Sequence, residues 1–316
     1  MAELPCVVVA DPIDAAALDR LRAGPCRVVD ASADPRSLDG ALSDAWALIV
    51  RSRTKVTSSL LAKAPKLSLV ARAGVGVDNI DLPAARARGI RVVNAPAAAT
   101  ASVAELAIAL YLLLVRGLYT QIAATKAGRW DRGTHGGELS GRTVGFVGYG
   151  RIAREIARRL GPFGARTIAY DPFVTAAVDA TELLPFEEVL ARSDVVSVHA
   201  ALTESNRHLL NAEAFARMKR GAYLVNVARG ALVDEAALAS ALDSGHLGGA
   251  ALDVLGVEPP VTPTLLARPN VIVTPHTGAS TAEAQRRAGV DTVDEVLRAV
   301  RGEPLTSLVA GEGGPR

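Results

Sequence analysis

The sequence has few cysteines and almost no net charge. Cys6 and Cys26 are its only cysteines among 316 residues, and their spacing matches no metal-binding or redox motif. We expect two free thiols in a reducing compartment. Thirty-five basic residues face 33 acidic ones, and no basic run with interleaved aromatic residues is present. This balance argues against nucleic acid as the main ligand.

Long hydrophobic runs are also missing. The longest apolar stretch, Val103 to Val115, is interrupted by Glu105 and Tyr111 and is too short to span a bilayer. It therefore predicts a buried helix. The first residues, Met-Ala-Glu-Leu-Pro, lack the basic region and apolar stretch of a secretory signal. We expect a cytoplasmic protein with no membrane partner.

Short aliphatic runs, in contrast, recur along the whole chain and alternate with alanine-rich helical stretches. Strands that are buried on both faces and alternate with helices are typical of parallel sheets, so the predicted fold class is α/β. The predicted strands are residues 7–10, 47–50, 67–71, 143–147, 167–170, 195–199, 223–226, 250–253 and 271–274.

A glycine-rich turn follows the strand 143–147 and opens a helix. Gly148 permits the tight turn, Gly150 lets the backbone approach a pyrophosphate, and Ala153 is small enough for the helix to pack on the strand. The helix N-terminus then offers free N–H groups to the phosphates. Asp171 ends the next strand, where it would bind the adenosine ribose hydroxyls and repel a 2′-phosphate. The pattern predicts NAD in preference to NADP.

This motif lies in mid-chain, with strand and helix units on both sides of it, so two doubly wound domains are expected. Helices over about 102–116 and 281–301 would connect them. We predict a flavodoxin-like substrate-binding domain of residues 1–98 and 286–316, and a Rossmann-like dinucleotide-binding domain of residues 99–285. The cleft between two such domains is the natural binding site.

Three chemically active side chains stand just past predicted strands, where ligands of open α/β sheets bind: Arg229, Glu258 and His276. An imidazole can give a proton to the alkoxide that hydride transfer produces. A carboxylate beside it favours the charged imidazole, and a guanidinium binds a substrate carboxylate bidentately. The set predicts a 2-hydroxy acid or its 2-oxo partner as substrate.

Each of the three residues also has a simpler interpretation. Arg229 alone could form a surface ion pair, Glu258 could be a solvated turn residue, and His276 could cap a helix. Their joint placement at strand ends favours the catalytic interpretation. Of the other histidines, His199 is expected to be structural or to contact the cofactor, and His135, His208 and His246 are expected at the surface.

Two further strand-end loops occur in the first domain. Arg51-Ser52-Arg53-Thr54 follows the strand 47–50, and a glycine-rich loop runs from Gly74 to Asn79, just after Arg72. Glycines let backbone N–H groups point toward an anion, and the arginines favour a clamp for an acidic substrate. The candidate substrate-binding residues are Arg51, Ser52, Arg72, Gly74, Val75, Gly76 and Asn79.

From about residue 45 to 310 the chain resembles the D-isomer-specific 2-hydroxyacid dehydrogenases. The resemblance rests on Arg51–Thr54, Gly74–Asn79, Ser102–Glu105, the glycine fingerprint, Val225–Gly230, Val233–Glu235, Ala250–Val254, Glu258–Pro260 and Pro275–Thr281. It implies substrate binding and carbonyl polarisation by Arg229, support of the imidazole by Glu258, acid and base catalysis by His276, and a nicotinamide contact by Asp253. It implies no metal, and we expect a homodimer. The expected cofactor-binding residues are Thr100, Gly148, Gly150, Arg151, Ile152, Asp171, Val227 and Asp253.

Within that family, residues 51–57, 164–172 and 302–306 most resemble the members that interconvert 3-phosphoglycerate and 3-phosphohydroxypyruvate. Arg51 and Arg72 could then meet the phosphate or the carboxylate. Two alternatives remain: a glyoxylate or hydroxypyruvate reductase, which needs less positive charge in these loops, and an NAD-sensing protein like the corepressors of the same fold. The sequence stops at Arg316 without the regulatory module of longer members, so feedback through such a module is not expected.

Overall fold

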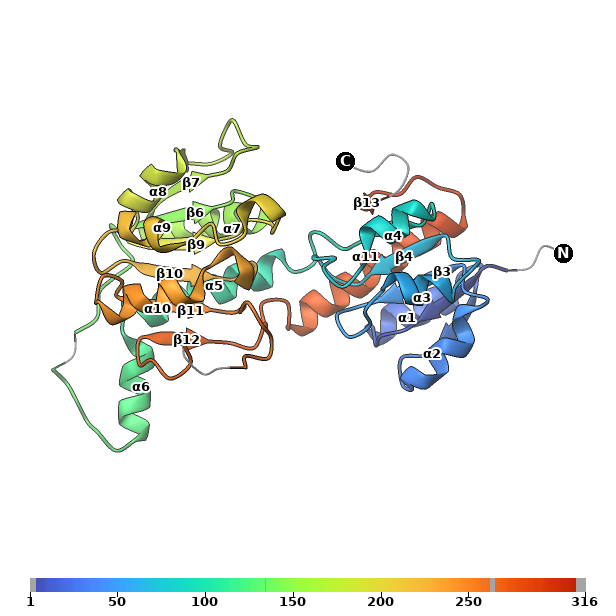
Figure 1. The fold of residues 1–316 in the computed structure, drawn as a ribbon, viewed down its shortest axis with the longest axis horizontal. Coiled ribbons are helices and arrows are strands. Elements are labelled where there is room, and N and C mark those ends of the chain that lie inside the picture. Colours follow the sequence, from blue (N-terminus) through green and yellow to red (C-terminus); the bar gives the residue numbers. More distant parts are fainter. Residues whose placement is uncertain (1–3, 134, 262–264, 311–316) are drawn as a thin grey trace. The chain divides into compact units, whose positions relative to one another are not determined.

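The structure is a computed structural model that describes residues 4–133, 135–261 and 265–310 (Figure 1). It forms two compact units, residues 1–99 with 279–316 (unit 1) and residues 100–278 (unit 2). The chain returns to unit 1 at Ala279, earlier than the expected residue 286, because Thr281 already caps the helix that packs there. The ends of the expected substrate domain, 1–3 and 311–316, lie outside the described residues.

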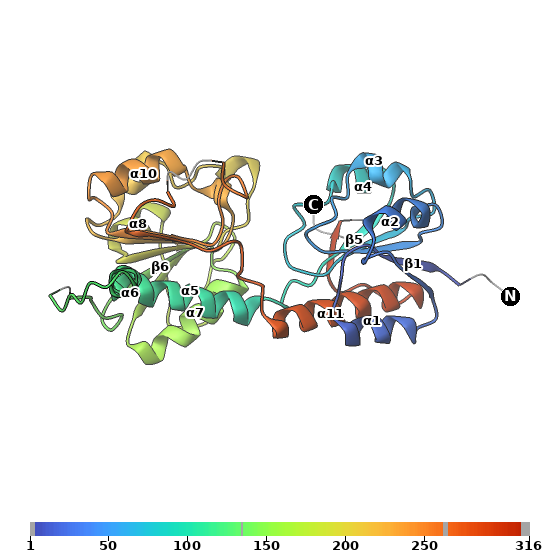
Figure 2. The same cartoon turned by 90° about the horizontal axis from the view of Figure 1, so that it is seen from below.

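Unit 1 is a six-stranded sheet in the order β13-β5-β4-β3-β1-β2. Five strands are parallel and β13 is antiparallel to β5. Figure 2 shows helices on both faces of this sheet. The strands are β1 (Cys6–Val9), β2 (Arg27–Asp30), β3 (Ala47–Val50), β4 (Leu69–Arg72), β5 (Arg91–Val93) and β13 (Leu308–Ala310). The helices are α1 (Ala15–Arg22) and α11 (Ala282–Val300) on one face, and α2 (Pro35–Leu42), α3 (Ser58–Ala62) and α4 (Leu82–Ala87) on the other.

Burial on both faces explains the continuous aliphatic strands of unit 1. In β1 the side chains of Val7 and Val9 pack with α1 and α11, whereas Val8 packs in the core of the opposite face. Successive side chains of a strand point to opposite faces, so both must be apolar when helices cover both.

Unit 2 is a seven-stranded parallel sheet in the order β12-β11-β10-β9-β6-β7-β8. The chain runs outward from β6 in one direction through β7 and β8, and in the other from β9 to β12. The switch point therefore lies between β6 and β9. The strands are β6 (Thr143–Val147), β7 (Arg166–Tyr170), β8 (Glu182–Leu183), β9 (Val195–Val198), β10 (Tyr223–Asn226), β11 (Gly249–Leu252) and β12 (Val271–Val273).

Helices cover both faces of this second sheet as well (Figure 2). One face carries α5 (Thr100–Val115) and α7 (Arg151–Leu160), and α6 (Leu118–Lys126) continues from α5. The other face carries α8 (Phe186–Arg192), α9 (Ala212–Arg217) and α10 (Glu235–Asp243). The buried helix expected around 103–115 is confirmed as α5. Among the described residues no single helix has the length and hydropathy to cross a membrane, and α5 with α6 would do so only as a pair bent by 72°.

The α/β class and the nine predicted strands are confirmed, with small shifts at their ends. Four strands were missed. β2 has charged residues at both ends and no fully buried position, β5 and β13 have three residues each, and β8 has two. Strands this short or this exposed carry too few apolar residues to stand out in a sequence.

Candidate active site

The glycine turn after β6 has the geometry that a dinucleotide diphosphate requires. Gly148 has φ +93°, and a Cβ there would lie 2.6 Å from the amide nitrogen of Ala200, so only glycine fits. A Cβ on Gly150 would meet nothing within 4 Å, which leaves its surface open, and Ala153 is fully buried. α7 begins after Gly150 without a side-chain cap, so its first amides are available to an anion.

Asp171 lies beside this turn, directly after β7. Its Oδ2 accepts a hydrogen bond of 2.8 Å from the amide of Tyr149, and its Oδ1 accepts one of 2.9 Å from the amide of Phe173. Each carboxylate oxygen keeps a further lone pair, which can accept from a ribose hydroxyl. Of the other expected cofactor residues, Arg151 and Ile152 open α7, Thr100 opens α5, and Val227 follows β10.

A buried polar chain lies at the switch-point end of β9. Tyr111 donates from its hydroxyl to Ser197 Oγ at 2.7 Å, and Ser197 Oγ lies 2.8 Å from His199 Nε2. Burial lowers the pKa of His199 to about 3. A neutral imidazole results at ordinary pH, so His199 does not compete with His276 as an acid.

The remaining histidines divide into two kinds. His135 and His208 are exposed, as expected. His246 is half-buried, and its Nε2 lies 2.9 Å from the carbonyl oxygen of Phe215 and 3.0 Å from that of Met218. The expectation that His246 is a simple surface residue was therefore wrong, since it closes the end of α9.

The structure joins His276 to Glu258. Nδ1 of His276 lies 2.8 Å from Oε2 of Glu258, and the two side chains are 53% and 37% exposed. His276 has φ +52°, a left-handed conformation that non-glycine residues seldom adopt and that often marks functional sites. Because Nδ1 is held by the carboxylate, Nε2 is the nitrogen left for a reacting group.

Asp253, directly after β11, holds the His276 loop. Its Oδ1 accepts from the Thr274 hydroxyl at 2.6 Å and from the amide and hydroxyl of Thr277 at 2.8 and 3.1 Å. Its Oδ2 accepts from the amide of Gly278 at 2.8 Å. The side chain is buried, and a carboxylate offers about four acceptor positions for such donors. Asp253 thus fixes the loop, a role that the sequence did not reveal.

Arg229 follows β10, which neighbours β11 in the sheet. It is half-buried, its Nη1 donates to the carbonyl of Ala228 at 2.7 Å, and its own carbonyl accepts from Asn226 Nδ2 at 2.9 Å. A Cβ on the next residue, Gly230, would overlap the backbone of Leu255. The Arg229 loop therefore packs directly on the loop that carries Glu258.

In unit 1 the loop after β3 is organised by Asp11, which is 1% exposed. Its carboxylate accepts from the amides of Arg51 and Thr54 at 2.6 and 3.1 Å and from the Thr54 hydroxyl at 2.7 Å. Burial raises the pKa of Asp11, but hydrogen bonds from Thr54, Arg51 and Arg53 outweigh it, and the pKa lies below its ordinary value. Asp11 was not among the residues predicted from the sequence. The signal was present, because it closely follows a buried strand, as Asp171 and Asp253 do.

Arg53 and Asn79 serve the same loop. Nε of Arg53 donates to Asp11 at 3.0 Å, and its Nη2 donates to the carbonyls of Ala10 and Ser32 at 2.7 and 2.9 Å. Nδ2 of Asn79 donates to the carbonyls of Arg51 and Thr54, both at 2.7 Å. Arg53 was expected in a clamp for an acidic substrate. In the structure its guanidinium binds Asp11 and two backbone carbonyls of unit 1. The side chain of Arg51 donates from Nη1 to the Pro12 carbonyl at 3.3 Å, and a guanidinium carries five N–H donors in all.

The glycine-rich loop after β4 packs closely around Arg72. Gly74 has φ +156°, and a Cβ there would overlap the Arg72 guanidinium, so the absence of a side chain lets this arginine fold over the loop. The carbonyl of Val75 accepts from Asn94 Nδ2 at 2.6 Å. Gly76 is half-buried, and Ser52 in the loop after β3 is exposed.

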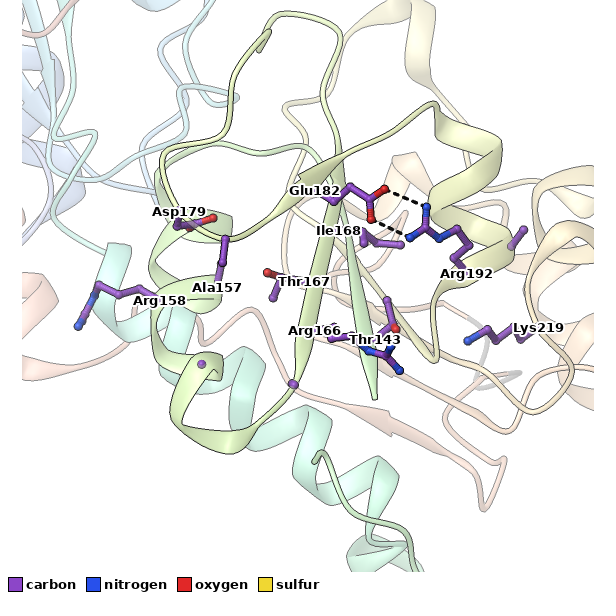
Figure 3. A pocket seen from close by; sticks show the side chains of 14 residues that line it. Thr143, Ala157, Arg158, Arg166, Thr167, Ile168, Asp179, Glu182, Arg192 and Lys219 are labelled. Carbon is purple, nitrogen blue, oxygen red and sulfur yellow. Dashed lines mark hydrogen bonds and ion pairs between the residues drawn. The ribbon is translucent and has the colours of Figure 1, made fainter. Parts of the chain in front are cut away.

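A cavity of about 700 Å³ lies at the opposite, amino-terminal strand ends of unit 2 (Figure 3). Thr143, Arg166 and Glu182 line it at the starts of β6, β7 and β8. Its other cations are paired: Arg192 with Glu182 at 2.7 Å, Lys219 with Asp194 at 2.9 Å and Arg158 with Glu155 at 2.8 Å. It therefore belongs to no part of the predicted site. Within the described ranges, no three His, Cys, Asp or Glu side chains gather as metal ligands would.

Sequence comparison identifies close relatives. The chain is 46% identical over 320 residues to a D-3-phosphoglycerate dehydrogenase of Mycobacterium leprae, covering 99% of this chain and 60% of the relative. It is 43% identical over 313 residues to the human D-3-phosphoglycerate dehydrogenase, covering 98% of this chain and 59% of the relative. The chain thus spans about 60% of the length of these curated relatives.

Solved structures with the same fold cover nearly the whole chain. The TT0316 protein of Thermus thermophilus superposes with a TM-score of 0.87 at 37% identity, covering 96% of this chain and 100% of the other. A glyoxylate reductase of Paecilomyes thermophila gives 0.88 at 31% identity, covering 98% and 99%. Residues 108–278 match the family described as D-isomer specific 2-hydroxyacid dehydrogenase, NAD binding domain. The chain belongs to the D-isomer specific 2-hydroxyacid dehydrogenases, and unit 2 contains its NAD-binding domain.

Proposed function

We propose that the protein is an NAD-dependent dehydrogenase that interconverts 3-phosphoglycerate and 3-phosphohydroxypyruvate. The observation that carries the proposal is the 2.8 Å bond between His276 and Glu258. Both residues follow strands of an NAD-binding domain, and the Arg229 loop packs against the Glu258 loop. The names of the curated relatives support the choice of substrate.

The reaction needs an acid–base group, an orienting group and a cation for the carboxylate. A bound nicotinamide supplies the hydride acceptor for oxidation or the donor for reduction. When the C2–H hydride leaves, Nε2 of His276 takes the proton of the C2 hydroxyl, and Glu258 stabilises the resulting imidazolium. Arg229 binds the substrate carboxylate and polarises the C2 oxygen. In the reductive direction His276 returns the proton.

Cofactor binding is assigned to the glycine turn and to Asp171. Gly150, Arg151 and Ile152 at the start of α7 hold the diphosphate, and Asp171 accepts from the ribose hydroxyls. Thr100 and Val227 are proposed to line the same site, and one acceptor position on Asp253 Oδ2 is proposed for the nicotinamide carboxamide.

Substrate selection is assigned to unit 1. We assign the phosphate to Arg51 and Arg72, with Ser52 and the amides of residues 74–76 as further donors. Asn79 contributes by holding the Arg51 loop in place. The similarity to a glyoxylate reductase favours a second candidate, reduction of small 2-oxo acids, which have no phosphate to bind.

We further infer a cytoplasmic homodimer. α6 has no buried residue, and it exposes Tyr119 and Ile122, with Trp130 81% exposed shortly after it. A helix with no buried residue and with exposed apolar side chains is a suitable surface for a second subunit. Cys6 and Cys26 are both buried, and neither forms a disulfide with another described residue, as is common for thiols of a reducing compartment. Light scattering during gel filtration tests the dimer, and a monomer at micromolar concentration would contradict it.

The experiment that tests the function is an assay of NADH absorbance with a panel of hydroxy and oxo acids. The proposal expects 3-phosphohydroxypyruvate to give the highest kcat/KM. Higher efficiency with glyoxylate or hydroxypyruvate would favour the second candidate. No turnover of any acid, with NADH still bound, would support the corepressor-like alternative.

A further inference from the structure

Glu258 is held by its own loop. Its Oε1 accepts from the amide of Leu255 at 3.0 Å, and its Oε2 bonds to His276 at 2.8 Å. The loop itself is largely exposed from Gly256 onward. The position of the carboxylate therefore depends on whatever fixes the backbone of Leu255 and Gly256.

Glu235 provides one such contact. It is the first residue of α10, and its Oε1 accepts from the amide of Gly256 at 2.6 Å. Glu258 and Glu235 thus bind two consecutive amides of the loop, one from within it and one from outside it. A charged acceptor makes such a bond roughly twice as strong as a neutral one.

Gly230 provides the second contact. It opens the short 3₁₀ turn Gly230–Leu232, and a Cβ there would overlap the backbone of Leu255. That turn directly follows Arg229 and leads into the helix that begins with Glu235. One segment, residues 229–235, therefore carries the arginine, touches the loop at Gly230 and binds it at Glu235.

We propose that Glu235 is a positioning residue that sets Glu258, and through it His276, against the Arg229 segment. In this proposal it acts through Glu258 and not on the substrate or the cofactor itself. The kinetic consequence rests on the proposed function, but the effect on the His276–Glu258 bond does not. Without Glu235 the Gly256 amide bonds to water instead, the loop loses its hydrogen bond to α10 and keeps only the packing against Gly230, and the bond between Glu258 and His276 loosens.

Four variants test this inference. Glu235→Ala removes the acceptor, and Glu235→Asp keeps the charge but retracts it by one methylene, so both should lose the contact. Glu235→Gln keeps an oxygen that can accept from Gly256 and should restore the wild-type behaviour. The matched control is Asp234→Ala, because Asp234 caps the same helix through the amides of Ala236 and Ala237 without touching the loop.

The first readout is independent of any substrate. The protein has five histidines, so the ¹⁵N resonance of His276 Nδ1 can be assigned by comparison with the His276→Ala variant. Glu258→Gln gives the reference for a weakened bond. The Ala and Asp variants of Glu235 should move the resonance toward that reference, whereas Glu235→Gln and Asp234→Ala should leave it near wild type.

The second readout is kinetic. Glu235→Ala and Glu235→Asp should lower kcat about tenfold, since small misplacements of a catalytic group are costly, while KM for NADH stays constant. Asp234→Ala should lower the thermal midpoint with kcat unchanged. The inference is overturned if Glu235→Asp retains the wild-type resonance, or if Glu235→Gln is as impaired as Glu235→Ala. If the wild type turns over no 2-hydroxy or 2-oxo acid, the proposed function fails and the resonance alone decides.

Discussion

Asp11 in unit 1 and Asp253 in unit 2 are buried aspartates with the same task. Each stands just past a parallel strand and accepts hydrogen bonds from the loop that follows the neighbouring strand, residues 51–54 for Asp11 and 274–278 for Asp253. They differ in their donors. Asp11 pairs with the Arg53 guanidinium at 3.0 Å, whereas Asp253 accepts from amides and hydroxyls.

A buried aspartate at a strand end therefore supports two different kinds of site. With its charge offset by Arg53, Asp11 anchors a loop that presents Arg51, a permanent cation suited to an anion. Asp253 anchors a loop that presents His276, which exchanges a proton. We assign substrate binding to the Arg51 loop and proton transfer to the His276 loop. Substitutions of the two aspartates can test the two roles separately.

The largest effect is expected from Asp253→Asn. The Asn side chain places an NH₂ donor where the carboxylate accepted hydrogen bonds from backbone amides and hydroxyls. The His276 loop should therefore shift. We expect kcat to fall about a hundredfold, because misplacement of about 1 Å can cost that much. Steady-state assay with NADH measures it. Asp11→Asn is the matched control in unit 1. An equal loss of kcat in that variant would contradict the assignment of substrate binding to unit 1 and of proton transfer to unit 2.

Arg51→Ala should instead change KM. The variant removes a charge-assisted contact made in ground and transition state alike, so KM for the phosphorylated acid should rise about tenfold for a bond worth roughly 1.5 kcal/mol. Activity on glyoxylate should change less. If both substrates lose efficiency equally, Arg51 binds the common carboxylate, and the phosphate assignment loses its support.

The preference for NADH over NADPH tests the role proposed for Asp171 in unit 2. Asp171 would meet a 2′-phosphate with like charge, at a cost of at least about 1 kcal/mol, so kcat/KM with NADH should exceed that with NADPH about tenfold or more. The comparison needs only the wild type. Equal efficiency with both cofactors would remove the role given to Asp171.

The smallest effect concerns the pH dependence of stability. The pKa of Asp11 lies below its ordinary value of 3.8, so its ionised form stabilises the fold above that pH, and this contribution is lost as pH falls through the folded pKa. At pH 7, Asp11→Asn should lower the free energy of unfolding by about 2 kcal/mol. Urea unfolding should show the gap closing below about pH 4. A constant gap down to pH 2 would mean that ionisation of Asp11 does not stabilise the loop.

The sequence predicted the strand-end placement of Arg229, Glu258 and His276 because parallel strands are continuous aliphatic runs whose carboxyl ends can be read directly. It also predicted the glycine turn, since the backbone geometry at Gly148 requires glycine. It did not reveal what holds the loops. Asp11, Asp253 and Glu235 act through backbone amides of distant residues, and such contacts leave no local pattern. The pairing of Arg53 with Asp11 was missed for the same reason, since the two residues are 42 positions apart.

The most direct test is the effect of His276→Ala on turnover and on NADH binding, measured on the same preparation. The account predicts that kcat for reduction of 3-phosphohydroxypyruvate falls about a hundredfold or more, because proton transfer by a positioned side chain contributes that much. The Kd for NADH, followed by fluorescence titration, should stay within about twofold of wild type, a difference below roughly 0.5 kcal/mol. A His276→Ala enzyme with wild-type kcat would contradict the assignment of acid–base chemistry to this loop.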